Sequence, residues 1–133
     1  MMRVAIWEEA LSDYISNKRD EPFQYGVNDC CMFAAGAVEA MTGVDPMEEF
    51  KGTYSDLRGS IKVLKEIGEG DLETTLDNKF EEVAISYAQR GDLAFFDESV
   101  GVIMGSFAYF VSDEGLERIP REMWEKCWSV DFG

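Results

Sequence analysis

Two adjacent cysteines stand where the sequence predicts the start of a helix. In the stretch FQYGVNDCCMFAAGAVEAMTG, residues 23–43, Cys30 and Cys31 follow directly after Asp29. Asp29 is a good N-cap because its carboxylate can accept hydrogen bonds from backbone N–H groups of the first turn. At the next position, free N–H groups and the positive end of the helix dipole favour a thiolate over a thiol. From this spacing alone, a small buried side chain is the favoured interpretation of Cys30, and a reactive nucleophile is the alternative.

The chain contains no histidine, which is the usual partner of a catalytic thiol. Imidazole takes the thiol proton and later returns a proton to the leaving amine of an amide substrate. A carboxylate such as that of Asp97 or Glu98 is a weak substitute, since reference pKa values are about 4 for a carboxyl group and about 8.5 for a thiol. A negative charge beside Cys30 also opposes thiolate formation. The sequence therefore argues against amide cleavage by this chain.

Composition predicts one globular domain that spans residues 1–133. Hydrophobic residues make up 46% of the sequence, which suffices for a packed core. No apolar run approaches the ~18–20 residues that span a bilayer. A signal peptide needs an uninterrupted apolar segment, whereas Glu8 and Glu9 place charges in the first residues of this chain. We expect a soluble protein without a membrane span, kept inside the cell or exported without a signal. The three cysteines predict reduced thiols, with no metal site and no cofactor.

The net charge of -15 repels phosphate backbones, so direct binding of nucleic acid is not expected. A solvated surface that keeps the protein soluble is the simplest interpretation. The alternative is an acidic protein that occupies the nucleic-acid site of a host enzyme. This alternative predicts binding to a host protein with a basic surface.

Hydrophobic spacing predicts helices first and strands second, which indicates an α+β fold. The helices are expected at residues 4–16, 29–41 and 56–67, with a short helical turn at 70–80. Short β-rich runs then form an antiparallel meander: 81–88, 92–97, 100–105, 107–112, 115–120 and 128–132. Residues 90–92, Arg-Gly-Asp, are predicted to form a turn before a strand. Residues 120–127 are predicted to form one helical turn that begins at Pro120. Trp124, Trp128 and Met123 are expected in the core or at an interface.

Residues 25–43 and the later run 89–105 resemble the NlpC-type cell-wall cysteine peptidases, papain-like enzymes that cut peptide bonds in bacterial peptidoglycan. In this resemblance Cys30 falls on the nucleophile and Asp29 on the acidic residue before it. Residues 91–96 fall on a strand motif, and Ser99 falls where the family has its general-base histidine. The resemblance implies a papain-like NlpC-type fold in which N-terminal helices pack on a small antiparallel sheet.

Two residues before the cysteines are candidates for binding rather than for catalysis. Tyr25 and Gly26 can form a substrate rim or an oxyanion wall if a cleft is present. A turn that sets the entry into the helix is the alternative for both.

A tighter resemblance, over nearly the whole chain, is to a family of small phage and prophage proteins with an Asp-Cys-Cys motif. The positions that carry it are Pro22, Phe23, Tyr25, Gly26, Asp29, Cys30, Cys31, Thr42, Gly43, Asp45, Pro46, Gly52, Tyr54, Arg90, Gly91 and Asp92. It implies a tail-associated protein, at the tail tip, whose histidine-free NlpC-like domain is structural or binding rather than catalytic.

The implied partners are other phage tail proteins, a host protein with a basic surface, and peptidoglycan. The implied locations are the host cytoplasm during synthesis and the virion tail. Two alternatives stay open. One is a thiol hydrolase of peptidoglycan peptide bonds whose base comes from a substrate or a partner chain. The other is the acidic inhibitor that mimics nucleic acid.

Overall fold

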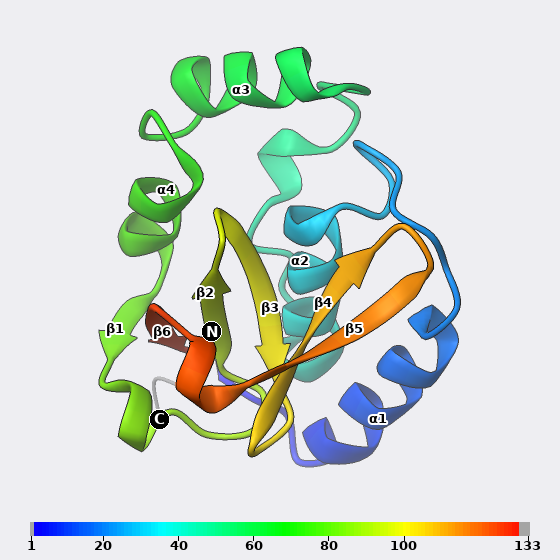
Figure 1. Ribbon diagram of the computed structural model, residues 1–133, viewed down its shortest axis with the longest axis vertical. Helices are drawn as coiled ribbons and strands as arrows, with labels where there is room; N and C mark the ends of the chain where they lie inside the picture. The colour runs from blue at the N-terminus through cyan, green and yellow to red at the C-terminus, as the bar shows by residue number, and fades with distance from the viewer. Residues whose placement is uncertain (1, 131–133) are drawn as a thin grey trace.

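The helices come first along the chain and the strands second, as expected of an α+β fold (Figure 1). The computed structural model describes residues 2–130. Within them the helices are α1 (Trp7–Lys18), α2 (Cys30–Thr42), α3 (Leu57–Glu66) and α4 (Leu72–Lys79). The strands are β1 (Glu81–Val83), β2 (Leu93–Phe96), β3 (Ser99–Ile103), β4 (Phe107–Ser112), β5 (Gly115–Pro120) and β6 (Lys126–Ser129). The predicted α+β class is therefore confirmed.

Helix α1 begins three residues later than its hydrophobic spacing predicts and extends to Lys18. The delay has a cause in the tertiary structure, because the N–H of Val4 donates to the carbonyl of Met41 at 2.8 Å. This bond ties the segment before α1 to the end of α2. Leu11 and Ile15 then form the buried stripe of α1.

Helix α2 is the central helix, and its two ends are capped as the sequence predicts. Asp29 accepts a hydrogen bond from the backbone N–H of Met32, and Gly43 ends the helix in the left-handed conformation. Gly36 lets α1 approach closely, since a Cβ atom there would lie 2.2 Å from the hydroxyl oxygen of Tyr14. That hydroxyl donates to the carbonyl of Phe33 at 2.8 Å, which fixes α1 against α2.

The sheet is antiparallel, with strand order β1-β6-β2-β3-β4-β5. The predicted meander holds for β2 to β5, but β6 returns to lie between β1 and β2. The strand expected at 128–132 begins earlier, at Lys126, and residues 131–132 lie outside the described part of the chain. The expected helical turn after Pro120 is a short 3-10 helix, Arg121–Met123.

Both faces of the sheet are covered by apolar side chains. Leu93, Phe95 and Trp128 point to the face that packs against α2 and α4, whereas Ala94 and Cys127 point to the opposite face. The alternation follows from the two-residue period of a strand. Trp124 and Trp128 are core residues, as expected, but Met123 is 48% exposed and lies outside the core.

Helix α3 lies across one end of the molecule, apart from the sheet (Figure 1). Val63 alone is buried among the residues of α3, all of which are described. Leu57 and Ile61 are large apolar side chains that stay about half exposed. This placement leaves an apolar helix face beside the N-terminus of α2.

Candidate functional site

The loop before α2 is held in place by a buried amide. Asn28 is 1% exposed, and its Nδ2 donates to the carbonyl oxygens of Glu21 and Pro22, each at 3.1 Å. A bridge between Gln24 and Asn28 closes the loop on itself. The position of Cys30 at the first turn of α2 is therefore fixed by the chain that precedes it.

Asp29 connects three segments through its two carboxylate oxygens. Oδ1 accepts from the N–H of Met32 at 2.9 Å, which caps α2. Oδ2 accepts from the N–H of Gly26 at 2.8 Å and from the Tyr54 hydroxyl at 2.5 Å. The structure thus assigns Asp29 a positioning role, since it joins the loop, the helix start and the segment before α3.

Tyr54 was not identified from the sequence as a site residue, although it is part of the site. Burial and the hydrogen bond to Asp29 both raise the pKa of its phenol, so Tyr54 stays protonated and serves as a donor. The only sequence feature that pointed to Tyr54 was its place, with Gly52, in the phage-type motif. That motif does not indicate which residue the tyrosine hydrogen-bonds.

The two binding candidates of the sequence have different environments. Tyr25 lines a cleft, and its ring packs edge-on against Phe23 with centroids 4.7 Å apart. Gly26 has φ +80°, and a Cβ atom there would lie 2.3 Å from the carbonyl oxygen of Tyr54. Glycine is therefore needed at position 26 for backbone conformation and close approach, as in the alternative interpretation of a turn.

Cys30 is the first residue of α2, and its pKa is lowered to about 7. The largest cause is a hydrogen bond from the Cys31 thiol; the backbone of Val100 and the side chain of Ser99 add further hydrogen bonds. Burial and the charge of Asp29 oppose the shift. The residue expected at the histidine position, Ser99, thus does contact the thiol, where it stabilises the thiolate by hydrogen bonding.

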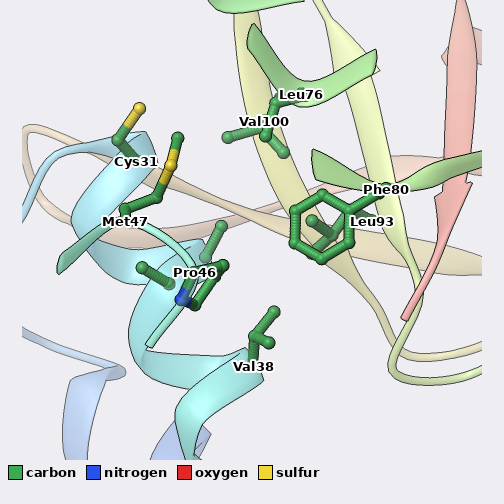
Figure 2. A pocket seen from close by; sticks show the side chains of 10 residues that line it. Cys31, Val38, Pro46, Met47, Leu76, Phe80, Leu93 and Val100 are labelled. Atoms are coloured by element: carbon green, nitrogen blue, oxygen red, sulfur yellow. The ribbon is translucent and has the colours of Figure 1, made fainter. Parts of the chain in front are cut away.

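Cys31 has the opposite behaviour, because its hydrogen bond to Cys30 and its burial raise its pKa well above the usual value. Its side chain also borders an apolar cavity between α2 on one side and the sheet and α4 on the other (Figure 2). Figure 2 shows Cys31 and Met47 opposite Val100, Leu76 and Phe80. The cavity holds only about 10 Å³, too little for a ligand. Cys31 is thus a hydrogen-bond donor to Cys30.

A larger cleft of about 430 Å³ opens at the thiol. It falls within the usual range for small-molecule sites, ~300–1,000 Å³. Its lining brings together the predicted residues Tyr25, Asp29, Cys30 and Ser99. The apolar wall comes from α3 and the start of α4, with Leu57, Ile61, Leu64 and Leu72. Neither the apolar wall nor the volume was foreseen from the sequence.

The rim of the cleft is acidic. The tip of the β2–β3 hairpin contributes Asp97 and Glu98, and the start of α4 contributes Asp71. Asp97 and Glu98 have φ 51° and 59°, a conformation that non-glycine residues rarely adopt. The N–H of Asp97 donates to Glu125 at 2.9 Å, which helps to hold the tip. No lysine or arginine is among the described residues that line the cleft.

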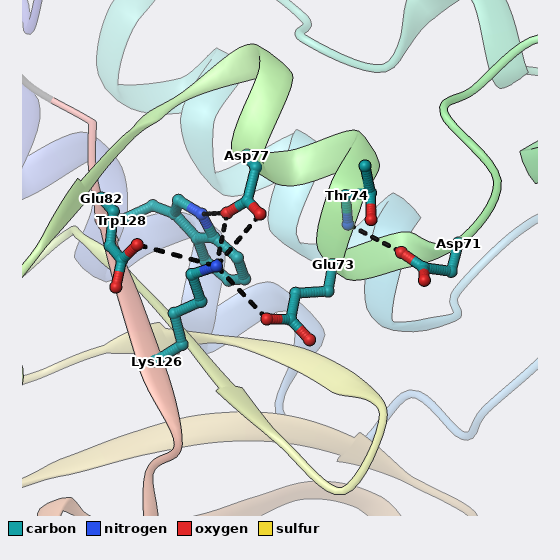
Figure 3. Close-up of polar contacts among 7 residues, drawn as sticks. All are labelled: Asp71, Glu73, Thr74, Asp77, Glu82, Lys126 and Trp128. Atoms are coloured by element: carbon teal, nitrogen blue, oxygen red, sulfur yellow. Dashed lines mark hydrogen bonds and ion pairs between the residues drawn. The ribbon is translucent and has the colours of Figure 1, made fainter.

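Helix α4 attaches the cleft wall to the sheet through a charged network. Asp71 caps α4 by accepting from the N–H of Thr74, and Asp77, in the second half of the helix, binds β6 (Figure 3). Lys126 pairs with Asp77, Glu73 and Glu82, and the buried indole of Trp128 donates to Asp77 at 2.9 Å. The contacts around Lys126 support the position of the apolar wall, and of the residues in this network only Asp71 lines the cleft.

A family model described as a domain of unknown function, DUF6950, matches residues 2–130. The chain belongs to the DUF6950 family. No curated protein matches it. The matched residues include every part of the cleft, so the site described above is part of the DUF6950 domain.

Membrane spans and metal-ion clusters are two other features to consider in residues 2–130. None of the helices there is long and apolar enough to cross a bilayer. In the same residues, no cluster of three or more Cys, Asp or Glu side chains could hold a metal ion. The cleft itself presents the Cys30 thiol, the hydroxyl groups of Ser99 and Tyr54, and carboxylate groups.

Proposed function

We propose that this DUF6950 domain is a histidine-free, NlpC-like domain of a phage or prophage tail protein, which binds a cell-wall peptide in its cleft without cleaving it. The observation that carries the proposal is the convergence of Tyr25, Asp29, Cys30 and Ser99 on one open cleft. The papain-like resemblance of the motifs around Cys30 and Ser99 supports the NlpC-type fold, and the phage-type motif supports the tail association.

The absence of amide cleavage follows from acid–base chemistry. An amide expels an amine, which must receive a proton as the C–N bond breaks. The chain has no imidazole to supply that proton, and Ser99 occupies the position beside the thiol. A serine hydroxyl neither holds nor releases a proton near neutral pH, so a bound peptide stays intact.

Sedimentation with purified peptidoglycan sacculi tests the proposal. The wild type and Cys30→Ser should sediment with sacculi to the same extent, since binding does not need the thiol. Tyr25→Ala, in the cleft, should sediment about tenfold less well, as expected when an aromatic binding residue is removed. Tyr87→Ala is the matched control, because Tyr87 is 75% exposed and lies outside the cleft.

The same samples are assayed for newly released amino groups, and none should appear. Release of amines by the wild type but not by Cys30→Ser would replace the proposal with a thiol hydrolase that takes its base from the substrate or a partner. Wild-type protein that stays in the supernatant would exclude peptidoglycan as the ligand.

The hydrolase alternative has one observation in its favour, the lowered pKa of Cys30 in an open cleft. The inhibitor alternative rests on the net charge of -15. It predicts salt-sensitive binding to a basic host protein that is independent of Cys30.

A further inference from the structure

We propose that Cys30 exchanges acyl groups with thioesters that enter the cleft, so that the chain carries an acyl group on this thiol. The inference goes beyond the peptide-binding function, since it concerns a different bond and a different class of substrate. Three features of the site carry it: the place of Cys30 in the lining of a large cleft, the groups that surround the thiol, and the chemistry of the cleft walls.

The leaving group decides which acyl compounds a thiol without a general acid can attack. An amide needs a proton for its departing amine, whereas a thioester releases a thiolate, which leaves as the anion. The sulfur of Cys30 adds to the thioester carbonyl carbon, and the tetrahedral intermediate then expels the other sulfur with its electron pair. The products are acyl-Cys30 and the free thiolate. No proton, oxidant or reductant is consumed.

The site holds the attacking group in the required form. The Ser99 side chain and the Val100 backbone hydrogen-bond the Cys30 sulfur, and the Cys31 thiol donates to it. These contacts favour the anionic form of the sulfur, and Cys30 is one of the residues that line the cleft. They replace the proton removal that imidazole performs in a thiol peptidase.

The start of α2 also provides donors for the oxyanion of the intermediate. The first hydrogen bond within the helix runs from the N–H of Phe33 to the carbonyl of Asp29, at 2.9 Å, and the Asp29 carboxylate takes the N–H of Met32. The N–H groups of Cys30 and Cys31 precede both bonds and have no partner within the helix. They lie beside the thiol, where negative charge develops on the carbonyl oxygen.

The cleft walls define the class of thioester. Leu57, Ile61 and Leu64 form an apolar surface on α3, part of it exposed, and an aliphatic acyl chain would remove this surface from water. The acidic rim of Asp97 and Glu98 repels anionic carriers. The preferred substrate is therefore a neutral or cationic thioester with an apolar acyl group.

Disulfide exchange is less suited to the same pair of thiols. Adjacent residues have Cα atoms about 3.8 Å apart, whereas disulfides span about 4.4–6.8 Å. Cys31 lies in the first turn of α2, so it cannot resolve a mixed disulfide on Cys30 without disrupting the helix start. The pair thus favours acyl exchange, in which Cys31 acts only as a hydrogen-bond donor.

The experiment uses the full chain and S-hexanoyl-N-acetylcysteamine, a neutral thioester. Intact mass spectrometry should show one hexanoyl group per chain, and peptide mapping should place it on Cys30. Near pH 7, Cys30 should be acylated about tenfold faster than glutathione is by the same probe, because the low pKa favours its thiolate. The acylation rate should also saturate with probe concentration, because the probe binds in the cleft before it reacts. The amide analogue, with nitrogen in place of the sulfur, should give no label.

Variants separate the cleft from general thiol reactivity. Cys30→Ala should abolish labelling. Ile61→Ser should reduce the preference for the hexanoyl over the acetyl probe, whereas Ile67→Ser should not. Ile61 and Ile67 are 45% and 44% exposed, but only Ile61 lines the cleft. Hexanoyl-coenzyme A should react more slowly than the neutral probe because its phosphates face the acidic rim.

Several outcomes would overturn the proposal: labelling of Cys30 no faster than that of glutathione, a rate that stays linear in probe concentration, or label spread over the three cysteines. Consumption of the amide analogue would show that the site protonates a leaving amine. None of these results depends on whether sacculi bind, so the peptide-binding function stands or falls separately.

Discussion

Ser99 is the residue that most changes the interpretation of the thiol. In the sequence resemblance to NlpC-type peptidases, Ser99 falls at the position of the general-base histidine, which suggests the loss of a catalytic group. In the structure its side chain hydrogen-bonds Cys30 and helps to lower the pKa of that thiol to about 7. Ser99 cannot move a proton as imidazole does, but it can stabilise a charge that is already present. The site therefore holds a candidate nucleophile, whereas the chain has no imidazole.

Alkylation of Cys30 against pH measures this effect directly. In the wild type the rate should rise with a midpoint at about pH 7. Ser99→Ala should move the midpoint upward by about one pH unit, because a hydrogen bond to a charged group is lost. Peptide mass spectrometry reports each cysteine separately. Cys127 is the internal reference, since burial raises its pKa to about 11 and it should react slowly at neutral pH.

The matched control is Ser106→Ala, an exposed serine that does not line the cleft. An unchanged midpoint in Ser99→Ala would show that Ser99 does not stabilise the thiolate. A midpoint near the reference value of about 8.5 in the wild type would remove the basis for acyl exchange at neutral pH.

At the scale of elements, the cleft exists because α3 and α4 stand away from the thiol, while α4 is attached to the sheet. Helix α3 buries little of its own surface, so its position depends on the segments at its two ends. At one end Tyr54 binds Asp29, and beyond the other end α4 binds β6 through Asp77. These polar connections fix a wall that apolar packing alone does not hold.

Asp77 is the test of this attachment. Asp77→Ala leaves the buried indole N–H of Trp128 without its acceptor and should destabilise the fold by about 1–3 kcal/mol. Asp77→Asn keeps an acceptor oxygen and loses only the pairing with Lys126. It should therefore cost less than about 1 kcal/mol, because that pair is partly exposed. Urea unfolding at about pH 7 measures both.

The pH dependence gives a second check on Asp77. The hydrogen bond from the Lys126 side chain is the main cause of the lowered pKa of Asp77 in the folded state. The charged carboxylate of Asp77 therefore stabilises the fold at pH values above the unfolded carboxyl pKa of about 3.9. This contribution is lost as the pH falls through the lower pKa that Asp77 has in the folded state. The difference between the wild type and Asp77→Asn should be present at about pH 7 and should shrink in strong acid. Equal stability of all three proteins at neutral pH would contradict the attachment role.

At the scale of the whole molecule, an ion pair joins the start of the chain to the sheet. The guanidinium of Arg3 contacts Asp92 at 2.7 Å and donates to the carbonyl of Arg90 at 2.7 Å. Asp92 is 4% exposed and also accepts from the N–H groups of Gln89 and Val130. The Arg-Gly-Asp turn is therefore a structural junction, and its aspartate is not available to bind a partner.

Removal of Arg3 should destabilise the whole domain. Arg3→Met leaves the Asp92 carboxylate buried without its cation and should cost about 3–5 kcal/mol. The double variant Arg3→Met/Asp92→Asn removes the unpaired charge and should recover part of that loss. Chemical denaturation of the wild type, both single variants and the double variant measures the coupling free energy between Arg3 and Asp92. A loss below about 1 kcal/mol for Arg3→Met would show that the junction contributes little.

The sequence by itself determined the local features of this protein. The N-cap at Asp29, the end of α2 at Gly43 and the order of helices before strands follow from short-range rules of hydrogen bonding, backbone conformation and hydrophobic period. The placement of Cys30 at a helix start is of the same kind.

Only the tertiary structure decided what surrounds the thiol. The contact of Ser99 with Cys30 joins residues 69 positions apart, and Tyr54 reaches Asp29 from a third segment. The insertion of β6 between β1 and β2, and the half-exposed wall of α3, likewise depend on long-range pairing and packing. Local periodicity cannot specify such contacts, because their free energy arises only when distant segments exclude water together.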